Sequence, residues 1–347
     1  MPKVVFAIPG DLESPTGGYA YDRHVMARLP ELGLTVQHLA LPGSFPLPSA
    51  ADIAATAGAL ANVAADTVIL FDGLAFSALP TEIIRAIRQP LVAIVHHPLS
   101  FEPGLSEDTR DKLETSERAA LTFAKAVIVS SPVTRGVLSQ TFGVPSERIV
   151  IAIPGTSRAP RARGSGGTPS ILTVGAISPR KGYDVLIDAL ARIAGRPWRA
   201  TIVGSVERDP VTAAELAASI AKAKLTERIA MTGQVDERRL DALYASADLF
   251  VLSSRYEGYG MVLAEAQARG LPIVTTTGGA AAETAPDGAA LKVPPGDAAA
   301  LASAIARMLD EPTLRRNMSD SSWHAGQTLP DWSETTAIIA DTLRAAS

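Results

Sequence analysis

The 347-residue sequence contains no cysteine, which excludes disulfides, thiolate nucleophiles and cysteine-bound metals. Its five histidines include no HxxxH pair, which argues against a histidine-based metal site. It has no apolar run of roughly 18 residues, as a membrane-spanning helix requires, and its N-terminal apolar run is too short for a signal peptide. Long runs of like charge are also absent, which argues against an extended nucleic-acid surface. We therefore expect a cytoplasmic protein with no nucleic-acid partner and no evident membrane association.

What is present is the composition of a globular protein, 47% hydrophobic and 20% charged with a net charge of −4. The length favours two domains of roughly 150 to 200 residues each. Short β-branched apolar runs alternate with helical patterns, as in parallel sheets built from βαβ units, and this alternation occurs twice. The sequence thus predicts an α/β protein of two Rossmann-like, doubly wound domains that face each other across a cleft. The expected strands cover residues 3–8, 34–39, 67–72, 91–96, 126–131 and 148–153 in the first half, and 170–176, 199–205, 228–233, 247–254, 272–276 and 290–293 in the second.

The domain boundaries follow from a segment rich in Pro, Gly and Arg that lies between the two halves. We expect a first domain over residues 1–157 and a second over 168–320. Residues 321–347 have a helical pattern, and their tryptophans suggest a tail that packs back on the N-terminal domain.

Loops that follow strands matter most, because doubly wound sheets bind ligands beyond the carboxyl ends of their strands. Gly17 and Gly18 follow the first strand and precede a helix, where backbone amides and the helix dipole could attract an anion. Taken alone, glycines in such turns more often serve a steric need. Arg180 and Lys181 follow the first strand of the second half and would suit a diphosphate, although a solvated pair of cations is the plainer alternative.

The segment SSRYEGYGMVLAEAQARG places one glutamate, Glu257, in a loop and another, Glu265, about one turn into the helix that follows. The amides of Gly258, Tyr259 and Gly260 lie between them. This spacing lets the two acids reach different parts of a ligand bound at the helix N-terminus. Helix-start electrostatics or simple solvation would explain either acid alone.

The E-x7-E pair, the PRKG loop, the early TGG loop and the GGAAAE segment at 278–283 together resemble the family-four retaining glycosyltransferases of the GT-B type. The resemblance spans nearly the whole chain and is strongest over 170–300. It implies a hexosyltransferase that moves a sugar from a nucleotide-diphosphate sugar to a hydroxyl acceptor, with retention and without a further cofactor. Residues 1–157 would form the acceptor side and 168–320 the nucleotide-sugar side. The acceptor would be a small molecule or a glycan, and the sequence leaves the oligomeric state open.

The resemblance also assigns roles to residues. It implies that Glu257 holds the hydroxyls of the donor sugar, that Glu265 binds the ribose, and that Lys181 neutralises the diphosphate as the glycosidic bond breaks. It places His96 at the reacting sugar, where the residue orients hydroxyls or assists proton transfer. The expected catalytic residues are Glu257, Lys181 and His96. The expected donor-binding residues are Gly17, Gly18, Arg180, Lys181, Val235, Gly258, Tyr259, Gly260 and Glu265.

The sequence departs from the family pattern in one place and complicates it in another. Many relatives carry arginine where this chain has Ala176, so either Arg180 compensates or diphosphate binding is weaker. His97 lies directly beside His96 and competes with it for the same role.

The sequence has no D-x-D motif of the kind that holds a divalent cation in other glycosyltransferases, so we expect no metal at the site. Two other functions stay open. One is a catalytically silent GT-B protein that binds sugars or partners. The other is a nicotinamide-dependent oxidoreductase, which is disfavoured because no G-x-G-x-x-G follows the first strand.

Overall fold

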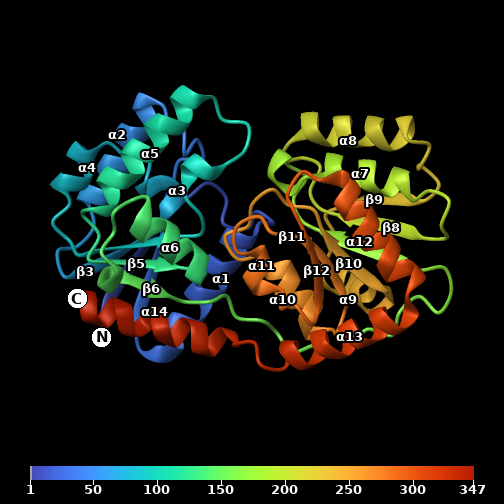
Figure 1. Cartoon of the computed structure of the whole chain (residues 1–347). Coiled ribbons are helices and arrows are strands. Elements are labelled where there is room, and N and C mark those ends of the chain that lie inside the picture. The colour runs from blue at the N-terminus through green and yellow to red at the C-terminus, as the bar shows by residue number, and fades with distance from the viewer. Residues whose placement is uncertain (1) are drawn as a thin grey trace. The chain divides into compact units, whose positions relative to one another are not determined.

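The computed structural model describes residues 2–347 and divides the chain into two compact units. The N-terminal unit runs to Gly155 and includes Pro330–Ser347, and the C-terminal unit comprises Thr156–Leu329. Each unit contains one parallel sheet flanked by helices (Figure 1). The predicted fold class, α/β with two doubly wound domains, is therefore confirmed.

The sheet of the N-terminal unit has the strand order β2-β1-β3-β4-β5-β6, and every pairing in it is parallel. Its inner strands are almost continuously buried because helices cover both faces of a parallel sheet. The direction of winding reverses between β1 and β3, and ligands bind at such a switch point. The strands are β1 (Lys3–Pro9), β2 (Thr35–Leu41), β3 (Thr67–Asp72), β4 (Leu91–Val95), β5 (Ala126–Val129) and β6 (Ile149–Ile151).

The helices of this unit begin mostly at serine, threonine or aspartate caps, which accept hydrogen bonds from the first-turn amides. The helix over Glu107–Leu121, for example, has Ser106 as its N-cap. The helices are α1 (Gly17–Arg28), η1 (Leu29–Leu32), α2 (Ala50–Ala61), α3 (Gly73–Phe76), α4 (Thr81–Ala86), η2 (Leu99–Phe101), α5 (Glu107–Leu121), α6 (Pro132–Gln140), η3 (Ser146–Arg148) and α14 (Trp332–Ala346).

The sheet of the C-terminal unit has the order β12-β11-β10-β7-β8-β9, so its switch point lies between β7 and β10. The strands are β7 (Ser170–Val174), β8 (Arg199–Val203), β9 (Ile229–Gly233), β10 (Leu249–Leu252), β11 (Ile273–Thr276) and β12 (Ala290–Val293). The helices are η4 (Pro179–Lys181), α7 (Tyr183–Arg192), α8 (Pro210–Lys222), α9 (Glu237–Ser246), α10 (Met261–Ala268), α11 (Ala281–Thr284), α12 (Ala298–Asp310) and α13 (Pro312–Gly326).

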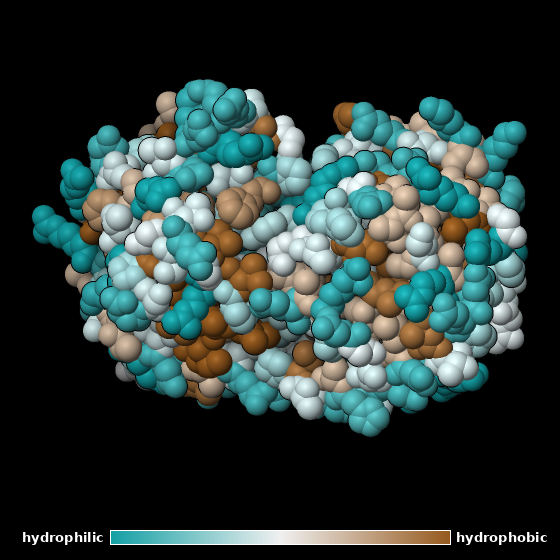
Figure 2. Space-filling view, in the orientation of Figure 1, coloured by the Kyte–Doolittle hydropathy of each residue, from teal (hydrophilic) through white to brown (hydrophobic). Residues whose placement is uncertain are grey.

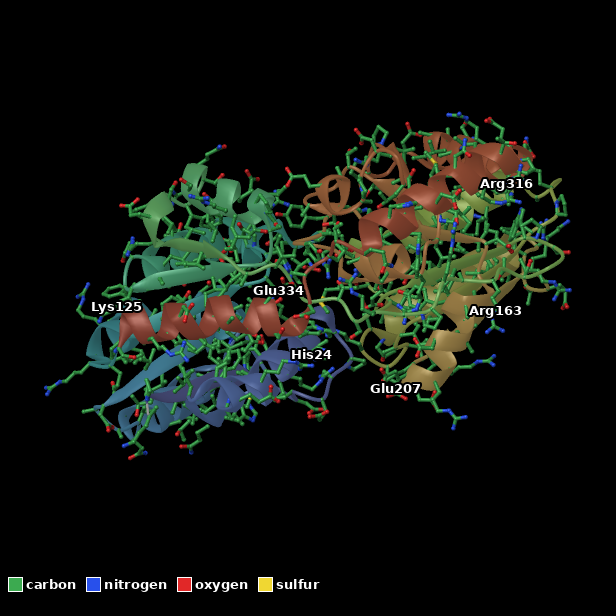
Figure 3. All side chains as sticks on the ribbon, turned by 90° about the horizontal axis from the view of Figure 1, so that it is seen from below. His24, Lys125, Arg163, Glu207, Arg316 and Glu334 are labelled. Atoms are coloured by element: carbon green, nitrogen blue, oxygen red, sulfur yellow. The ribbon has the colours of Figure 1, made fainter. Side chains whose placement is uncertain are left out.

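The last two helices belong to different units. Helix α13 packs on α10, and a side chain at Gly326 would meet the carbonyl of Gln267 at 2.3 Å. Helix α14 lies along α1 (Figure 3). The rings of Trp332 on α14 and His24 on α1 stack with their centroids 4.1 Å apart. The sequence placed the start of the tail at residue 321, which falls inside α13 rather than between two elements.

Gly270 follows the end of α10 and has a φ of 66°, a backbone conformation that favours glycine. Within residues 2–347, no helix is both long enough and apolar enough to cross a bilayer.

Candidate functional site

A cluster of charged residues occupies the switch point of the C-terminal unit. Lys181 follows β7 and Glu257 follows β10, and these two strands are neighbours in the sheet. The ammonium of Lys181 lies 2.5 Å from Oε1 of Glu257, and the guanidinium of Arg180 lies 3.4 Å from Oε2. The hydroxyl of Ser254 also donates to Oε1, at 2.5 Å. The structure thus joins three residues that the sequence predicted separately and adds Ser254.

The Glu257 carboxyl is 5% exposed and stays ionised. Its burial would raise its pKa, but the charges of Lys181 and Arg180 outweigh that effect and hold the pKa at about 2. The cluster therefore carries one negative and two positive charges, which leaves an excess of positive charge for an anionic ligand.

Close backbone contacts hold the two loops of this cluster together. Gly182 has a φ of 62°, and a Cβ atom there would lie 2.3 Å from the carbonyl oxygen of Ser253. The Ser253 hydroxyl donates to the carbonyl of Lys181, and the Arg255 amide donates to the carbonyl of Arg180 at 2.7 Å. Only glycine at position 182 permits this approach, which explains the glycine of the PRKG motif.

The loop before α10 is held by the first glycines of the GGAAAE segment. The Glu257 amide donates to the Gly278 carbonyl, and the Ala280 amide donates to the Glu257 carbonyl at 2.8 Å. Gly260, at the N-cap of α10, has a φ of 90°, so it too requires glycine. Gly258 and Tyr259 lie in the same loop, and Tyr259 is 9% exposed. The predicted amide-rich turn is thus placed at the start of α10.

Glu265 lies on α10 and has a partner that the sequence did not reveal. The phenol of Tyr244, on α9, donates to Oε2 of Glu265 at 2.9 Å. Burial raises the pKa of Glu265, against the opposing effects of the Tyr244 hydrogen bond and the Arg269 charge. Arg269 also stacks over the Tyr244 ring at 4.5 Å. Glu265 is therefore fixed from a neighbouring helix.

Val235, the remaining predicted residue of this unit, lies between β9 and α9. Its side chain is partly buried and packs against the core of the unit. It is not part of the charged cluster. Ala176 follows β7. Position 204 nearby requires glycine for steric reasons, since a Cβ atom there would lie 2.0 Å from the carbonyl oxygen of Gly175.

The switch point of the N-terminal unit carries a second cluster. Gly17 and Gly18 begin α1 after the N-cap Thr16, and a Cβ atom on Gly18 would lie 3.1 Å from the ring of His96. His96 Nε2 lies 3.3 Å from Oδ1 of Asp22, a fully buried residue of α1. The structure thus brings Gly18 and His96 together and adds Asp22.

Asp72 completes this second cluster from the end of β3. Among residues 2–347, one ligand atom each from Asp22, Asp72 and His96 lies within 4.8 Å of the others, so these groups could hold a metal ion. The neighbouring His97 has a different partner: its Nε2 lies 3.1 Å from the carboxylate of Glu102. This difference separates two histidines that the sequence could not distinguish.

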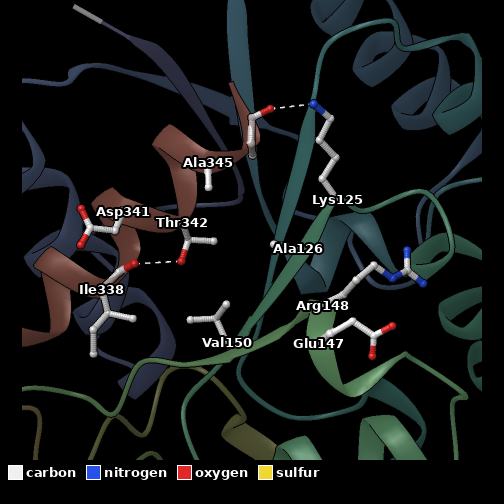
Figure 4. A pocket seen from close by; sticks show the side chains of 10 residues that line it. Lys125, Ala126, Glu147, Arg148, Val150, Ile338, Asp341, Thr342 and Ala345 are labelled. Carbon is white, nitrogen blue, oxygen red and sulfur yellow. Dashed lines mark hydrogen bonds between the residues drawn. The ribbon is translucent and has the colours of Figure 1, made fainter.

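A shallow hollow of about 540 Å3 lies at the other end of the N-terminal sheet, between β6 and α14 (Figure 4). Lys125 and Arg148 precede β5 and β6 there, and the Lys125 ammonium donates to the carbonyl of Ala346 at 2.8 Å. Figure 2 shows apolar side chains on the surface of the N-terminal unit near α14. Ile338, on this helix, is exposed. The hollow lies at the amino ends of the strands, whereas sheets of this type bind ligands at the carboxyl ends.

Known proteins share this fold over the whole chain. Sucrose-phosphate synthase from Thermosynechococcus elongatus is similar with a TM-score of 0.86 and 22% identity, over 100% of both chains. The Anabaena protein Alr3699/HepE, solved in complex with UDP-glucose, is similar with a TM-score of 0.79 and 20% identity, over 99% of both chains. The protein therefore has the GT-B fold.

Sequence comparison adds a match to a known family. Residues 158–322, nearly the whole C-terminal unit, match the model of the family described as glycosyl transferases group 1. Among curated relatives, mannosylfructose-phosphate synthase of Agrobacterium fabrum is 32% identical over 44% of this chain and 38% of its own length. The alpha-D-kanosaminyltransferase of Streptomyces kanamyceticus is 28% identical over 69% of this chain and 66% of its own length. The matched region thus spans about two thirds or less of these two relatives.

Proposed function

We propose that the protein is a retaining glycosyltransferase, which moves a sugar from a nucleotide-diphosphate sugar to a hydroxyl group of a small molecule or glycan. The observation that carries this proposal is the cluster of Lys181, Arg180 and Glu257 at the switch point of the C-terminal unit. The family of that unit and the UDP-glucose complex of the structurally similar Anabaena protein support it.

In the proposed reaction, the bond between the anomeric carbon and the diphosphate oxygen breaks, and negative charge develops on the leaving group. Lys181 and Arg180 stabilise that charge, and a preorganised charge of this kind is often the largest catalytic contribution. Lys181 has three N–H donors, so it can keep its bond to Glu257 while it binds a phosphate oxygen. Arg180 thereby compensates for Ala176.

The two glutamates serve different parts of the donor. Glu257, ionised and held by Lys181 and Ser254, accepts hydrogen bonds from the sugar hydroxyls. Glu265, fixed by Tyr244, binds the ribose hydroxyls. The acceptor oxygen attacks the anomeric carbon from the face that the diphosphate leaves, and its proton passes to the departing diphosphate. No cofactor takes part in this step, and we propose that no metal does.

The competing functions make different predictions. A silent sugar-binding protein would bind nucleotide diphosphates without turning over a donor. A nicotinamide-dependent oxidoreductase would be stabilised against heat by NAD but not by UDP or GDP. The basic cluster beside Glu257 favours a diphosphate that carries a hydroxyl-rich group.

The test is a panel of UDP and GDP sugars incubated with the full chain in the presence of EDTA, with slow donor hydrolysis followed by mass spectrometry. Lys181→Met and Glu257→Gln should each lower turnover about 100-fold or more. Arg196→Ala is the control, because it removes an exposed ion pair with Asp310 in the same unit. Equal hydrolysis by wild type and both variants would refute the site. Once a donor and an acceptor are found, the anomeric configuration of the product, read by NMR, tests retention.

A further inference from the structure

We propose that Arg255 is a positioning residue of the donor site, whose guanidinium holds in place the short turn that carries Arg180 and Lys181. The inference rests on the proposed function only for its effect on catalysis. Its effect on the turn stands on contacts within the C-terminal unit.

The turn that carries the two cations is η4, a single turn of 3-10 helix. Its N-cap Ser178 gives it no side-chain hydrogen bond, and Gly182 behind it has no side chain with which to cap α7. The amides of Lys181 and Gly182 donate to the carbonyls of Ser178 and Pro179 at 3.1 and 3.2 Å. Because hydrogen bonds of this type have poorer geometry than those of an α-helix, the position of the turn depends on neighbouring elements.

The loop after β10 supplies this support. Each carbonyl of the turn accepts a hydrogen bond from that loop, namely Pro179 from Nη1 of Arg255 at 2.6 Å, Arg180 from the Arg255 amide at 2.7 Å, and Lys181 from the Ser253 hydroxyl at 2.9 Å. Two of these bonds come from Arg255, one from its backbone and one from its side chain. A substitution at position 255 can therefore remove the side-chain contact and keep the backbone donor.

The backbone of Arg255 is itself fixed between neighbouring segments. A Cβ atom on Gly278 would lie 2.3 Å from the Arg255 carbonyl oxygen, so the GGAAAE segment packs directly against this residue. In the same loop, the Tyr256 carbonyl accepts a hydrogen bond from the guanidinium of Arg180 at 3.0 Å. Each of the two arginines thus binds a carbonyl oxygen in the loop of the other, which links the position of Arg180 to that of Arg255.

Asp184 fixes the direction of the Arg255 side chain. Its Oδ1 and Oδ2 accept hydrogen bonds from Nη1 and Nη2 of Arg255 at 3.0 and 2.6 Å. A bidentate pair of this kind sets the orientation of the guanidinium as well as its distance. Asp184 lies in the first turn of α7, so Arg255 contacts the chain both before the two cations, at Pro179, and after them.

A direct contact between Arg255 and the ligand is the competing interpretation, and it makes different predictions. Lysine at position 255 would keep the charge, but an ammonium cannot present the planar fork of donors that reaches both Pro179 and Asp184. If Arg255 acts through the turn, lysine does not replace it. If Arg255 binds a diphosphate itself, lysine should replace it in part, and removing the charge of Asp184 should strengthen the binding.

The first experiment measures the turn without any ligand. Hydrogen exchange of the Lys181 and Gly182 amides, followed by NMR of the full chain at pH 7, should be about tenfold faster or more in Arg255→Lys and Arg255→Ala than in wild type. The Arg255–Asp184 pair is 33% and 64% exposed, so its loss should leave the urea concentration of half-unfolding nearly unchanged. Arg196→Ala is the matched control, because it removes another exposed arginine–aspartate pair of this unit and should leave the turn unchanged.

The second experiment measures catalysis with a donor found in the panel of nucleotide sugars. Both Arg255 variants should lower kcat about 10- to 100-fold, since small displacements of catalytic groups have effects of this size. KM for the donor should change less, by about threefold or less, because the two cations act mainly on the charge that develops on the leaving group. Asp184→Asn should bind UDP or GDP no more tightly than wild type.

Four results would overturn the proposal. They are equal exchange of the turn amides in wild type and both Arg255 variants, wild-type kcat in Arg255→Lys, faster exchange without a fall in kcat, and tighter binding of UDP or GDP by Asp184→Asn. If Arg255→Ala fails to fold, Arg255→Lys decides. If wild type turns over no donor, the proposed function is wrong, and the exchange rates still decide whether Arg255 holds the turn.

Discussion

The ammonium of Lys181 lies 2.5 Å from the carboxylate of Glu257, and the two side chains are only 11% and 6% exposed. This ion pair joins the loops that follow β7 and β10 at the switch point of the C-terminal sheet. A buried pair of this kind constrains the fold, because either charge becomes costly once its partner is removed.

Removing only the lysine of the Lys181–Glu257 pair should destabilise the protein more than removing both charged side chains. Lys181→Met should lower the free energy of unfolding by about 3 kcal/mol or more, since it leaves a buried carboxylate with Arg180 as its remaining cation and the Ser254 hydroxyl as a neutral donor. The double variant Lys181→Met, Glu257→Leu should regain part of that loss. Urea denaturation at pH 7 measures both. The pair's contribution is complete above the ordinary glutamate pKa and is lost as the pH falls through about 2. Additive effects of the two substitutions would contradict the coupling.

The sequence predicted the charged members of this cluster one by one, because they lie in loops after strands. Lys181 and Glu257 each follow a short, mostly apolar strand, and a doubly wound sheet brings the carboxyl ends of such strands together. Both glutamates, the PRKG loop and His96 could therefore be found from local pattern.

Two residues near the predicted sites, Asp22 and Tyr244, could not be found from local sequence patterns. Asp22 lies inside a helical pattern and pairs with a histidine 74 positions away, while Tyr244 reaches Glu265 from a different helix. Neither contact leaves a periodicity in the sequence, because tertiary packing alone decides which buried polar groups meet. The same limit applies to the end of the chain, where α13 and α14 follow each other closely in the sequence but belong to different units.

The hydrogen bond from Tyr244 should matter for donor binding rather than for turnover. Tyr244→Phe removes the phenolic donor to Glu265 and leaves the ring in place. A hydrogen bond to a charged group contributes about 1.5 kcal/mol or more, so KM for the donor should rise roughly tenfold, with kcat changed less than twofold. Steady-state kinetics with the donor found in the panel would measure this. Glu265→Gln combined with Tyr244→Phe should cost less than the sum of the single effects, and full additivity would argue that the two residues act independently.

Glu117 should make the stability of the N-terminal unit depend on pH. This residue of α5 is 0% exposed, accepts hydrogen bonds from the Leu99 amide and the Ser77 hydroxyl, and has its pKa raised by burial to about 8. The folded state therefore holds a proton that the unfolded chain releases at a lower pH. The stabilisation is complete below the ordinary glutamate pKa of 4.5 and is lost as the pH rises to about 8.

Glu117→Gln imitates the protonated side chain and should remove this dependence. The urea concentration at which half of the variant is unfolded should increase relative to that of wild type as the pH rises from 5 to 8. Asp108→Asn on the same helix is the control, because Asp108 lies at the surface in an ion pair with Lys112. A constant difference between Glu117→Gln and wild type across this range would show that Glu117 is ionised in the folded protein.

Gly182 should be the least replaceable residue of the PRKG loop. Its φ of 62° is unfavourable for alanine by about 1–2 kcal/mol, and a Cβ atom there would lie 2.3 Å from the Ser253 carbonyl oxygen. Gly182→Ala should therefore lower the free energy of unfolding by more than about 2 kcal/mol and push apart the loops that carry Lys181 and Glu257. Gly195→Ala in the same unit is the control, since nothing lies within 4 Å of the added atom. If the two variants unfold at the same urea concentration, the close contact between the loops does not exist in solution, and the Lys181–Glu257 pair must be held together by its charges alone.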